Sequence, residues 1–393
     1  MAKMKDSGVE WIGYIPVDWK ISKIDTVYSP RNVKVSDNDY PPLSVTMKGI
    51  VPQLESAAKT NAHDSRKLVK KGDFAINSRS DRRGSCGISE YTGSVSLINT
   101  VLKPTENMIP RYFNWLFHTS LFADEFYKWG HGIVDDLWST GWQEMRKISI
   151  PFPKLSVQQQ IADFLDKKCA EIDSLSEDIQ KEIDLLEEYK KSVITEAVTK
   201  GLNPDVEMKD SGVVWIGKMP KQWQVIGTKY CFKIGNGSDP HTSEGNTPVY
   251  GSGAKSFKTC EEFKEGPTVL LGRKGTVNIP QWIEGKYWNV DTAFDVKAKG
   301  NYLLRLFYYC AICFDYDNYS TQTALPSMTQ ENYNNFLIPI MPMKEQISIV
   351  KYLDKKCTEI DKIISEKHDQ LTILSDYKKS LIYEYVTGKK EVI

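Results

Sequence analysis

The chain has 393 residues, which is enough for two or three domains with cores of their own. Lysine plus arginine and aspartate plus glutamate each total 51, so the formal net charge is zero. This balance argues against a bulk polyanion binder of the histone kind. It does not exclude DNA binding, because local basic faces are often offset by acidic helices elsewhere in a chain.

The opening residues, MAKMKDSGVEWIG, contain no apolar core of a secretory signal. The most apolar stretch, Leu303 to Phe314, is too short to cross a bilayer and contains Arg305. Seven cysteines is an odd number for a disulfide framework, so reduced thiols and a cytoplasmic location are expected.

Two segments of the chain occur twice. The segment from Met4 to Trp19 returns at Met208 to Trp223, with eleven of sixteen positions identical and an offset of 204. The segment LDKKCAEID at Leu165 to Asp173 returns as LDKKCTEID at Leu353 to Asp361, with an offset of 188. Repeats so far apart are not a solenoid period, and they mark a duplicated unit of domain size.

The order of these repeats divides the chain into four parts. We predict domains at 1–152 and 204–338, each followed by a helical region, at 153–203 and 339–393. The second unit is 16 residues shorter than the first, and this difference falls within the two domains, which share little sequence. The frame is therefore duplicated, while the framed domains have diverged.

Both domains have the pattern of mixed α/β structure. Short β-like runs, such as Asp73 to Asn77 and Thr268 to Leu271, are bounded by glycine and proline. Helical segments are predicted near Tyr112 to Tyr127 and near Tyr302 to Tyr316.

Each helical region carries an apolar stripe with a spacing near 3.5 residues, which is typical of a coiled coil. In the first region the stripe comprises Ile161, Leu165, Cys169, Ile172, Leu175, Ile179, Ile183, Leu186, Tyr189, Val193 and Ala197. In the second it comprises Ile349, Leu353, Cys357, Ile360, Ile363, Lys367, Leu371, Leu374, Tyr377, Leu381 and Tyr385, with Lys367 as the one break.

Each predicted helix has about 40 residues and is roughly 60 Å long at 1.5 Å per residue. One interpretation is that each stripe packs on its own domain, but few domains are that wide. We favour an antiparallel coiled coil between the two helices. The expected fold class is thus mixed α/β (α+β), with two globular domains separated by a coiled coil, pseudo-two-fold symmetry, and both termini near the helix ends beside the first domain.

A basic loop follows a β-like run in each domain. The candidate residues are Arg79, Ser80, Arg82, Arg83 and Ser85 in the first loop, and Arg273, Lys274 and Thr276 in the second. Clustered arginine among small hydroxyl residues suits contact with phosphate, and arginine also reads guanine edges. Lys48 and Lys255, in two other turns, are weaker candidates. The spacing alone is equally compatible with solvated charged loops.

Several fragments mimic enzyme motifs without their context. The fragment FKIGNG at Phe232 to Gly237 resembles a nucleotide-binding loop, but Ser238, Asp239 and Pro240 follow in place of a helix, so a turn is predicted. Cys310 and Cys313 form a single CxxC in an apolar run, which favours buried thiols over zinc. The five histidines have no metal spacing, so we predict no catalytic or metal site and no enzyme activity in this chain.

The sequence resembles the specificity subunits of type I restriction–modification systems over essentially its whole length. The resemblance rests on KDSGVEWIGYIPVDW and its second copy, on the domain exits from Trp142 and from Leu325, and on the helix entries from Gln158 and from Gln346 that lead into LDKKC. The usual Pro-Pro-Leu before the helix is degraded here, to Pro153-Lys-Leu and Pro342-Met-Lys.

The resemblance implies a non-catalytic DNA specificity subunit. The two domains would be target recognition domains that each read one half of an asymmetric, bipartite site in double-stranded DNA, and the coiled coil would set the spacer. Two methyltransferase subunits would dock on the duplicated frame, and restriction–translocase subunits would join them. S-adenosylmethionine, ATP and Mg²⁺ would belong to these partners, which would flip out and methylate adenine.

Two other functions stay open on the sequence. A self-sufficient, fused restriction or modification enzyme needs methyltransferase motifs, which we do not find in the chain. The other is an adaptor that does not bind DNA and has two domains on a coiled-coil spacer. Such an adaptor would show no salt-dependent affinity for duplex DNA.

Overall fold

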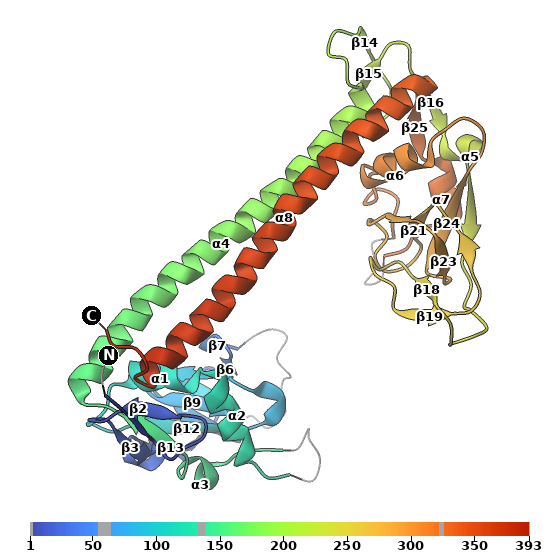
Figure 1. The fold of residues 1–393 in the computed structure, drawn as a ribbon. Coiled ribbons are helices and arrows are strands. Elements are labelled where there is room, and N and C mark those ends of the chain that lie inside the picture. The colour runs from blue at the N-terminus through green and yellow to red at the C-terminus, as the bar shows by residue number, and fades with distance from the viewer. Residues whose placement is uncertain (1–2, 54–63, 133–137, 322–325, 393) are drawn as a thin grey trace. The chain divides into compact units, whose positions relative to one another are not determined.

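The computed structural model of the chain describes residues 3–53, 64–132, 138–321 and 326–392. It consists of two compact units (Figure 1). Unit 1 contains Met1–Asp178 and Asp369–Ile393, and unit 2 contains Ile179–His368. Each unit has one α/β domain and a segment of each of two long helices, as the predicted fold class requires.

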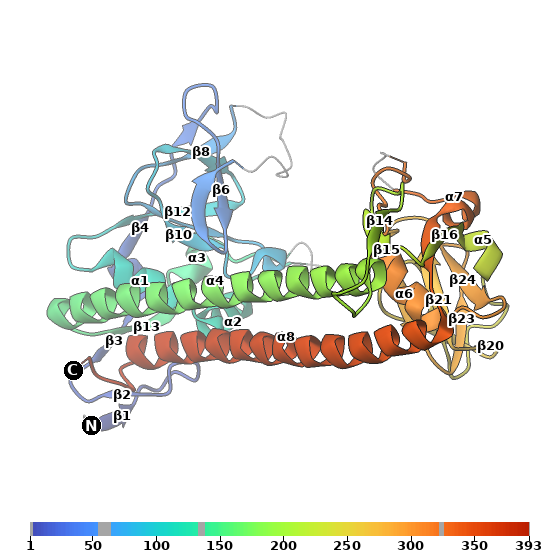
Figure 2. The same ribbon diagram turned by 90° about the horizontal axis from the view of Figure 1, so that it is seen from above.

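The domain of unit 1 is built on a four-stranded sheet in the order β10-β9-β12-β4. Its strands are β4 (Tyr28–Pro30), β9 (Phe74–Asn77), β10 (Cys86–Ile88) and β12 (Asn99–Pro104). A three-stranded sheet adds β5 (Lys34–Val35), β8 (Arg66–Val69) and β11 (Gly93–Ser96). The domain also contains the hairpin of β6 (Leu43–Thr46) and β7 (Gly49–Pro52), of which β6 is labelled in Figure 2.

Helices cover the four-stranded sheet of unit 1. They are α1 (Pro110–Phe117), α2 (Ser120–Lys128) and the short α3 (Trp142–Met145), with 3₁₀ turns η1 (Ile24–Thr26) and η2 (Ser80–Arg82). The side chains of Tyr112, Phe113, Leu116 and Phe117 recur every three or four residues on α1, and all four are buried. The ring of Phe117 packs against that of Phe74 on β9, with centroids 5.2 Å apart.

The domain of unit 2 has a four-stranded sheet in the order β17-β24-β21-β22. Its strands are β17 (Phe232–Asn236), β21 (Thr268–Gly272), β22 (Gln281–Ile283) and β24 (Ala293–Ala298). A second sheet, in the order β19-β18-β23-β20, contains β18 (Thr247–Tyr250), β19 (Lys258–Cys260), β20 (Lys264–Glu265) and β23 (Lys286–Asn289). The helices are α5 (Thr228–Cys231), α6 (Leu304–Ile312) and α7 (Gln330–Asn335).

The two main sheets have the same topology despite their unlike sequences. Strands β4, β12, β9 and β10 stand in the same order as β17, β24, β21 and β22, and all the pairings are antiparallel. The turn predicted at Phe232 to Gly237 is wrong, because residues 232–236 form strand β17. Phe232 and Ile234 point into the core on either side of exposed Lys233, which is the alternation of a half-buried strand.

Each domain is entered and left through one pair of antiparallel strands. In unit 1, β3 (Lys20–Lys23) pairs with β13 (Ser149–Phe152). In unit 2, β16 (Gln224–Gly227) pairs with β25 (Leu337–Ile340). The incoming and outgoing chain therefore lie side by side at the base of each domain.

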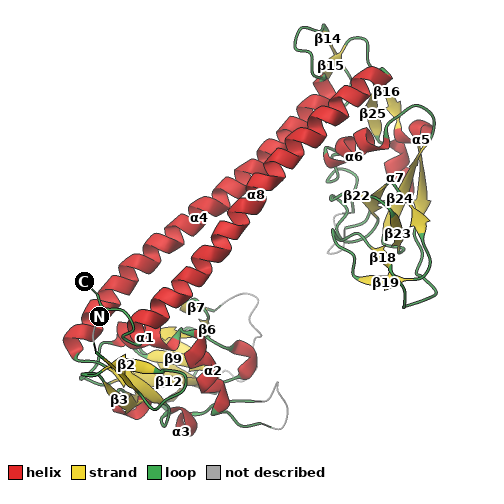
Figure 3. Cartoon of the chain, in the orientation of Figure 1, coloured by secondary structure: helices red, strands yellow, loops and turns green. Residues whose placement is uncertain are grey.

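The long helices are α4 (Leu155–Lys200) and α8 (Met343–Val386), drawn in red in Figure 3. In unit 1, Lys378 Nζ lies 2.6 Å from Asp173 Oδ1, and the rings of Phe164 and Tyr385 are 4.4 Å apart. In unit 2, Lys190 Nζ lies 2.6 Å from Asp361 Oδ1. The two ion pairs are equivalent under the 188-residue offset, and residue numbers rise on one helix as they fall on the other. The predicted antiparallel pairing is confirmed in each unit.

The apolar stripe is only partly buried, unlike the prediction. Beside the domains its side chains are covered, but Leu175, Tyr189, Ile363 and Tyr377 are 49%, 56%, 42% and 53% exposed. Two helices alone cover a narrow seam, so only some stripe positions beyond the reach of a domain, such as Ile179 and Ile183, are buried there. Lys367, the predicted break in the stripe, forms an ion pair with Glu182.

The duplicated N-terminal motif forms a hairpin in both units and packs on the end of a long helix. The hairpins are β1 (Met4–Asp6) with β2 (Tyr14–Pro16), and β14 (Met208–Asp210) with β15 (Lys218–Pro220). In unit 1, the hydroxyl of Tyr383 donates to the carbonyl oxygen of Ile12 at 3.2 Å, and Lys389 Nζ donates to the same oxygen at 2.7 Å. The chain ends thus meet beside the first domain, as predicted.

Candidate nucleic-acid interface

The first predicted loop, residues 78–85, connects β9 to β10 and contains the 3₁₀ turn η2. Arg82 is more open than Arg83, with a side chain 67% exposed against 47%, and its Nε lies 3.6 Å from Asp81 Oδ2. Arg83 is held in place, because its guanidinium lies 3.9 Å from the centroid of the Tyr127 ring and 3.0 Å from Asp124 Oδ1. Arg82 therefore offers an exposed charge, and Arg83 a charge held in position.

The second predicted loop, residues 273–280, connects β21 to β22. The backbone N–H of Arg273 donates to the carbonyl oxygen of Thr292 at 2.7 Å, and its Nη1 donates to that of Asp291 at 3.4 Å. Lys274 is exposed beside it. The loop thus holds Arg273 against the turn at Asp291 and Thr292 and exposes Lys274 to solvent.

The two loops occupy the same place in the two domains. Each links the third to the fourth strand of the shared sheet order, and each pairs with the segment that precedes a short helix. Arg79 forms a β-bridge with Ser139 before α3, and Lys274 forms one with Ser327 before α7. Two loops selected for their basic composition thus lie at one topological position, as loops on rigid sheets.

The remaining members of the first loop differ in exposure. Ser85 is 5% exposed, and its backbone N–H donates to the Arg82 carbonyl oxygen while its own carbonyl accepts from Asn77 N at 2.9 Å. Ser85 therefore lies beneath the loop and is not exposed for contact with DNA. Arg79 is exposed, and the side chain of Ser80 lies outside the described residues.

The weaker candidates lie on neighbouring turns. Lys48 is exposed at the tip of the β6–β7 hairpin, where Gly49 approaches Gly87 so closely that a Cβ on Gly87 would lie 2.8 Å from the Gly49 Cα. Lys48 therefore stands next to the first loop. Lys255 is exposed between β18 and β19, and Thr276 is half-buried in the second loop.

Sequence reasoning missed two exposed aromatic residues of the second domain, each of which lies beside a lysine. Phe257 is 60% exposed with Lys258 Nζ 5.6 Å from its ring centroid, and Phe263 is 49% exposed with Lys286 Nζ 3.9 Å from its centroid. Exposed rings next to cations suit contact with a polyanion that also presents flat bases. The adjacent Phe257-Lys258 pair in a glycine and serine loop was the available signal.

The thiols carry no site. All seven cysteines are free and buried, so the prediction for Cys310 and Cys313 is confirmed. Burial raises the pKa of Cys313 to about 11 and raises that of Cys310 further. Within the described ranges, no group of three histidine, cysteine or acidic residues is placed to hold a metal ion, and no helix is long and apolar enough to cross a bilayer.

Two stretches of the chain, residues 16–185 and 220–372, match the family model of the type I restriction modification DNA specificity domain. The chain belongs to this family. The specificity subunit therefore has two target recognition domains, one in each unit, and membership places it in a complex with modification and restriction subunits on DNA.

Individual relatives agree with this assignment. The putative type I restriction enzyme MjaX specificity subunit of Methanocaldococcus jannaschii is 24% identical over 325 residues, which are 74% of this chain and 71% of that protein. The MjaVIII specificity subunit of the same organism is 34% identical over 90 residues, which are 23% and 20% of the two chains.

A likeness to a solved structure concerns the fold. A chain in a structure that describes the assembly and conformational transition of a type I restriction–modification system has a TM-score of 0.73 to the specificity subunit. It is 12% identical, and the match covers 96% of this chain and 99% of that one.

Proposed function

We propose that each target recognition domain reads one half of an asymmetric, bipartite site in double-stranded DNA, through the loops at 78–85 and 273–280. The observation that carries this proposal is that both basic loops occupy the same connection of one shared sheet topology. A common scaffold with unlike loops is what two readers of different half-sites need, because rigid strands fix where a variable loop meets a groove.

The chemistry of the loops suits duplex DNA. Arg82 and Lys274 are exposed cations that suit phosphate oxygens, where they set affinity and its dependence on salt. Arg83 is held by Tyr127 and Asp124, and a pre-positioned guanidinium suits a bidentate contact to guanine O6 and N7. The first loop thus combines a backbone anchor with a candidate base reader.

The two long helices would set the spacer between the half-sites. The equivalent ion pairs Asp173–Lys378 and Lys190–Asp361 support one antiparallel register, because a slip of either helix would break both of them. In a pair of this kind, helix length determines the spacing of the domains, just as half-site spacing mirrors geometry in dimeric DNA-binding proteins.

The exposed apolar residues of the helices support two docking sites for one kind of partner. Leu175 and Ile363, Leu185 and Ile373, and Tyr189 and Tyr377 are equivalent pairs under the 188-residue offset, and all six are at least 42% exposed. Single exposed apolar residues need no explanation, but recurrence of the same set in both units does. We assign these sets to two methyltransferase subunits.

The chemistry of modification would belong to those partners. S-adenosylmethionine would be bound by the methyltransferase subunits, and ATP and Mg²⁺ by restriction–translocase subunits where the complex has them. The specificity subunit itself would be non-catalytic and would act in the cytoplasm, where it selects the site whose adenines are flipped out and methylated.

Coexpression with the cognate methyltransferase, followed by long-read mapping of methylated adenines, tests this function. We expect one bipartite motif with unlike halves and a fixed gap. Methylation by the purified chain alone would favour a fused enzyme. Lack of any salt-dependent affinity for duplex DNA, with or without the methyltransferase, would favour an adaptor and refute the proposal.

A further inference from the structure

Three loops of the second target recognition domain meet at one turn, residues 289–293, which begins with the buried Asn289. The backbone N–H of Ser238, in the loop after β17, donates to the Asn289 carbonyl oxygen at 3.0 Å. The second loop begins with Arg273, whose N–H donates to the Thr292 carbonyl oxygen at 2.7 Å. The loop after β18 begins with Gly251, where a Cβ would lie 2.9 Å from Thr292 Oγ1.

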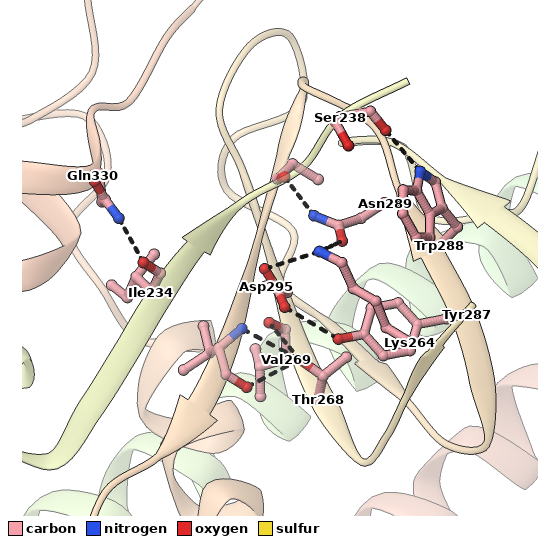
Figure 4. Close-up of polar contacts among 12 residues, drawn as sticks. Ile234, Ser238, Lys264, Thr268, Val269, Tyr287, Trp288, Asn289, Asp295 and Gln330 are labelled. Atoms are coloured by element: carbon pink, nitrogen blue, oxygen red, sulfur yellow. Dashed lines mark hydrogen bonds and ion pairs between the residues drawn. The ribbon is translucent and has the colours of Figure 1, made fainter. Parts of the chain in front are cut away.

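Asn289 is the centre of this turn and is fully buried. Its Nδ2 donates to the Ala293 carbonyl oxygen at 2.8 Å and so closes the turn, while its Oδ1 accepts from Lys264 Nζ at 2.8 Å. Both polar atoms of this buried side chain are thus hydrogen-bonded, one within the turn and one to Lys264 (Figure 4).

A charged pair supports Asn289 from beneath. Lys264 Nζ lies 3.4 Å from Asp295 Oδ1, and the hydroxyl of Tyr287 donates to Asp295 Oδ2 at 3.3 Å. The Asp295 side chain is 6% exposed and that of Lys264 is 23% exposed, so removal of one partner would leave the other charge poorly solvated. Lys264 therefore links the acid on the main sheet to the amide in the turn (Figure 4).

Two glycines make room for this arrangement. A Cβ on Gly235 would lie 2.5 Å from Asp295 Oδ1, so only glycine leaves space for the carboxylate. A Cβ on Gly237 would lie 2.0 Å from the Val290 carbonyl oxygen, so only glycine lets the loop reach the turn. These two glycines therefore allow the loop after β17 to approach the turn closely.

The loops that meet at the turn carry polar and charged groups of several kinds into solvent. The exposed residues are Ser238, Asp239, Lys255 and Lys274 in the loops, and Asp291 in the turn itself. Cations of this set suit phosphates, and carboxylates accept from the amino groups of cytosine and adenine. Such groups discriminate bases only while their relative positions are fixed.

From these contacts we propose that residues 237–241, 251–257 and 273–278 form one composite reading surface for the second half-site. Asn289 and Lys264 are its positioning residues, which act through the turn and not by touching DNA. This inference rests on the proposed function and extends it. The proposed function assigns the second half-site to the loop at 273–280 alone, whereas here three loops that contact the turn at Asn289 read it together.

The test uses the full chain coexpressed with its methyltransferase. Methylation is measured on the mapped motif and on single-base variants of each half-site. For Asn289→Ala we expect the preference for the mapped bases of the second half-site to fall by about fivefold or more, since one good base contact is worth about that much discrimination. The preference at the first half-site should stay unchanged.

Thr228→Val is the matched structural control. Thr228 is fully buried, and its hydroxyl donates to the Phe336 carbonyl oxygen at 2.9 Å at the start of α5, away from the turn. This variant also loses a buried hydrogen bond, so its thermal midpoint should fall, but its base preference should not. A defect of folding lowers the amount of active complex and leaves the ratio between sites intact.

Lys264→Met is the second variant and decides the matter if Asn289→Ala does not assemble. It keeps the aliphatic stem and removes the ammonium, so we expect the same loss of preference at the second half-site, to a smaller degree. Unchanged preference in the assembled variants, or an equal loss in Thr228→Val, would overturn the positioning role alone. A wild-type complex without sequence-specific methylation would instead overturn the proposed function.

Discussion

Gln346→Ala should detach the domain helix α6 from the long helix α8 without affecting the other unit. Gln346 is 2% exposed, and its Oε1 accepts from the backbone N–H of Leu303, the residue that precedes α6, at 2.9 Å. Its Nε2 donates to the carbonyl oxygens of Met341 at 3.0 Å and of Asn301 at 3.2 Å. Alanine leaves these buried groups unpaired, at a cost of about 1–3 kcal/mol for a stranded donor.

The equivalent residue of unit 1 gives an internal reference. Gln158 is fully buried, and its Oε1 accepts from Ile109 N, before α1, at 2.9 Å, while its Nε2 donates to the Pro153 carbonyl oxygen at 2.8 Å. Gln346 makes one more hydrogen bond than Gln158, so Gln346→Ala should be the more damaging change, at about 3 kcal/mol against about 2 kcal/mol.

Amide hydrogen exchange measures the effect at the two reporter amides. In Gln346→Ala, protection of the Leu303 amide should fall by about 100-fold, since each 1.4 kcal/mol is a factor of ten, while the Ile109 amide keeps its protection. Gln158→Ala should reverse the pattern. Gln160→Ala, which truncates an exposed side chain two residues after Gln158 on α4, is the control and should change neither. Loss of protection at both amides in either variant would refute the reasoning.

Four further outcomes are expected. Arg82→Ala should lower affinity at the first half-site only and reduce the salt slope of binding by about 1, and Lys274→Ala should do the same at the second; loss at both half-sites would contradict independent readers. One heptad inserted after Asp178 and one after Glu366 should lengthen the methylated motif's gap by about 3 base pairs, since seven helical residues span about 10.5 Å; an unchanged gap would refute the ruler. Fewer than one thiol per chain should react with Ellman's reagent at pH 8 before denaturation and all seven after it, because burial raises the pKa of Cys169 to about 11 and covers the others; fast native reaction would show that the cores are open. Replacement of residues 24–148 by 228–336 should yield a motif with two identical halves, and a motif that stays asymmetric would show that the domains are not independent.

The parts of the fold that depend on local pattern were predictable from the sequence. The long helices follow from an apolar spacing near 3.5 residues, and the two basic loops follow from charge next to β-like runs. The repeated glutamines at 158 and 346 were also visible as part of a family signature. Their hydrogen bonds to the residues that precede the domain helices were not predictable, because the backbone amides that they bind lie about 45 residues away in the chain.

The parts that depend on distant partners were not predictable. The shared strand order of the two domains is invisible at the level of sequence, because sheet pairing joins segments such as β4 and β12 that lie far apart in the chain. Leu175 and Tyr377 match the coiled-coil stripe, but their burial depends on a third surface, which the spacing of a single helix does not report. The role of Asn289 emerges only when three loops are placed around it.

The strand pairs β3–β13 and β16–β25 have a consequence for how such proteins change over generations. Because the chain enters and leaves each domain through one strand pair, an exchange of the interior sequence would leave the strands that join it to the frame in register. The duplicated MKDSGV–WIG segments before each domain and the LDKKC segments after it are matching stretches at which such an exchange would leave the frame unchanged. One exchange of this kind would give the subunit a new recognition specificity without a new frame.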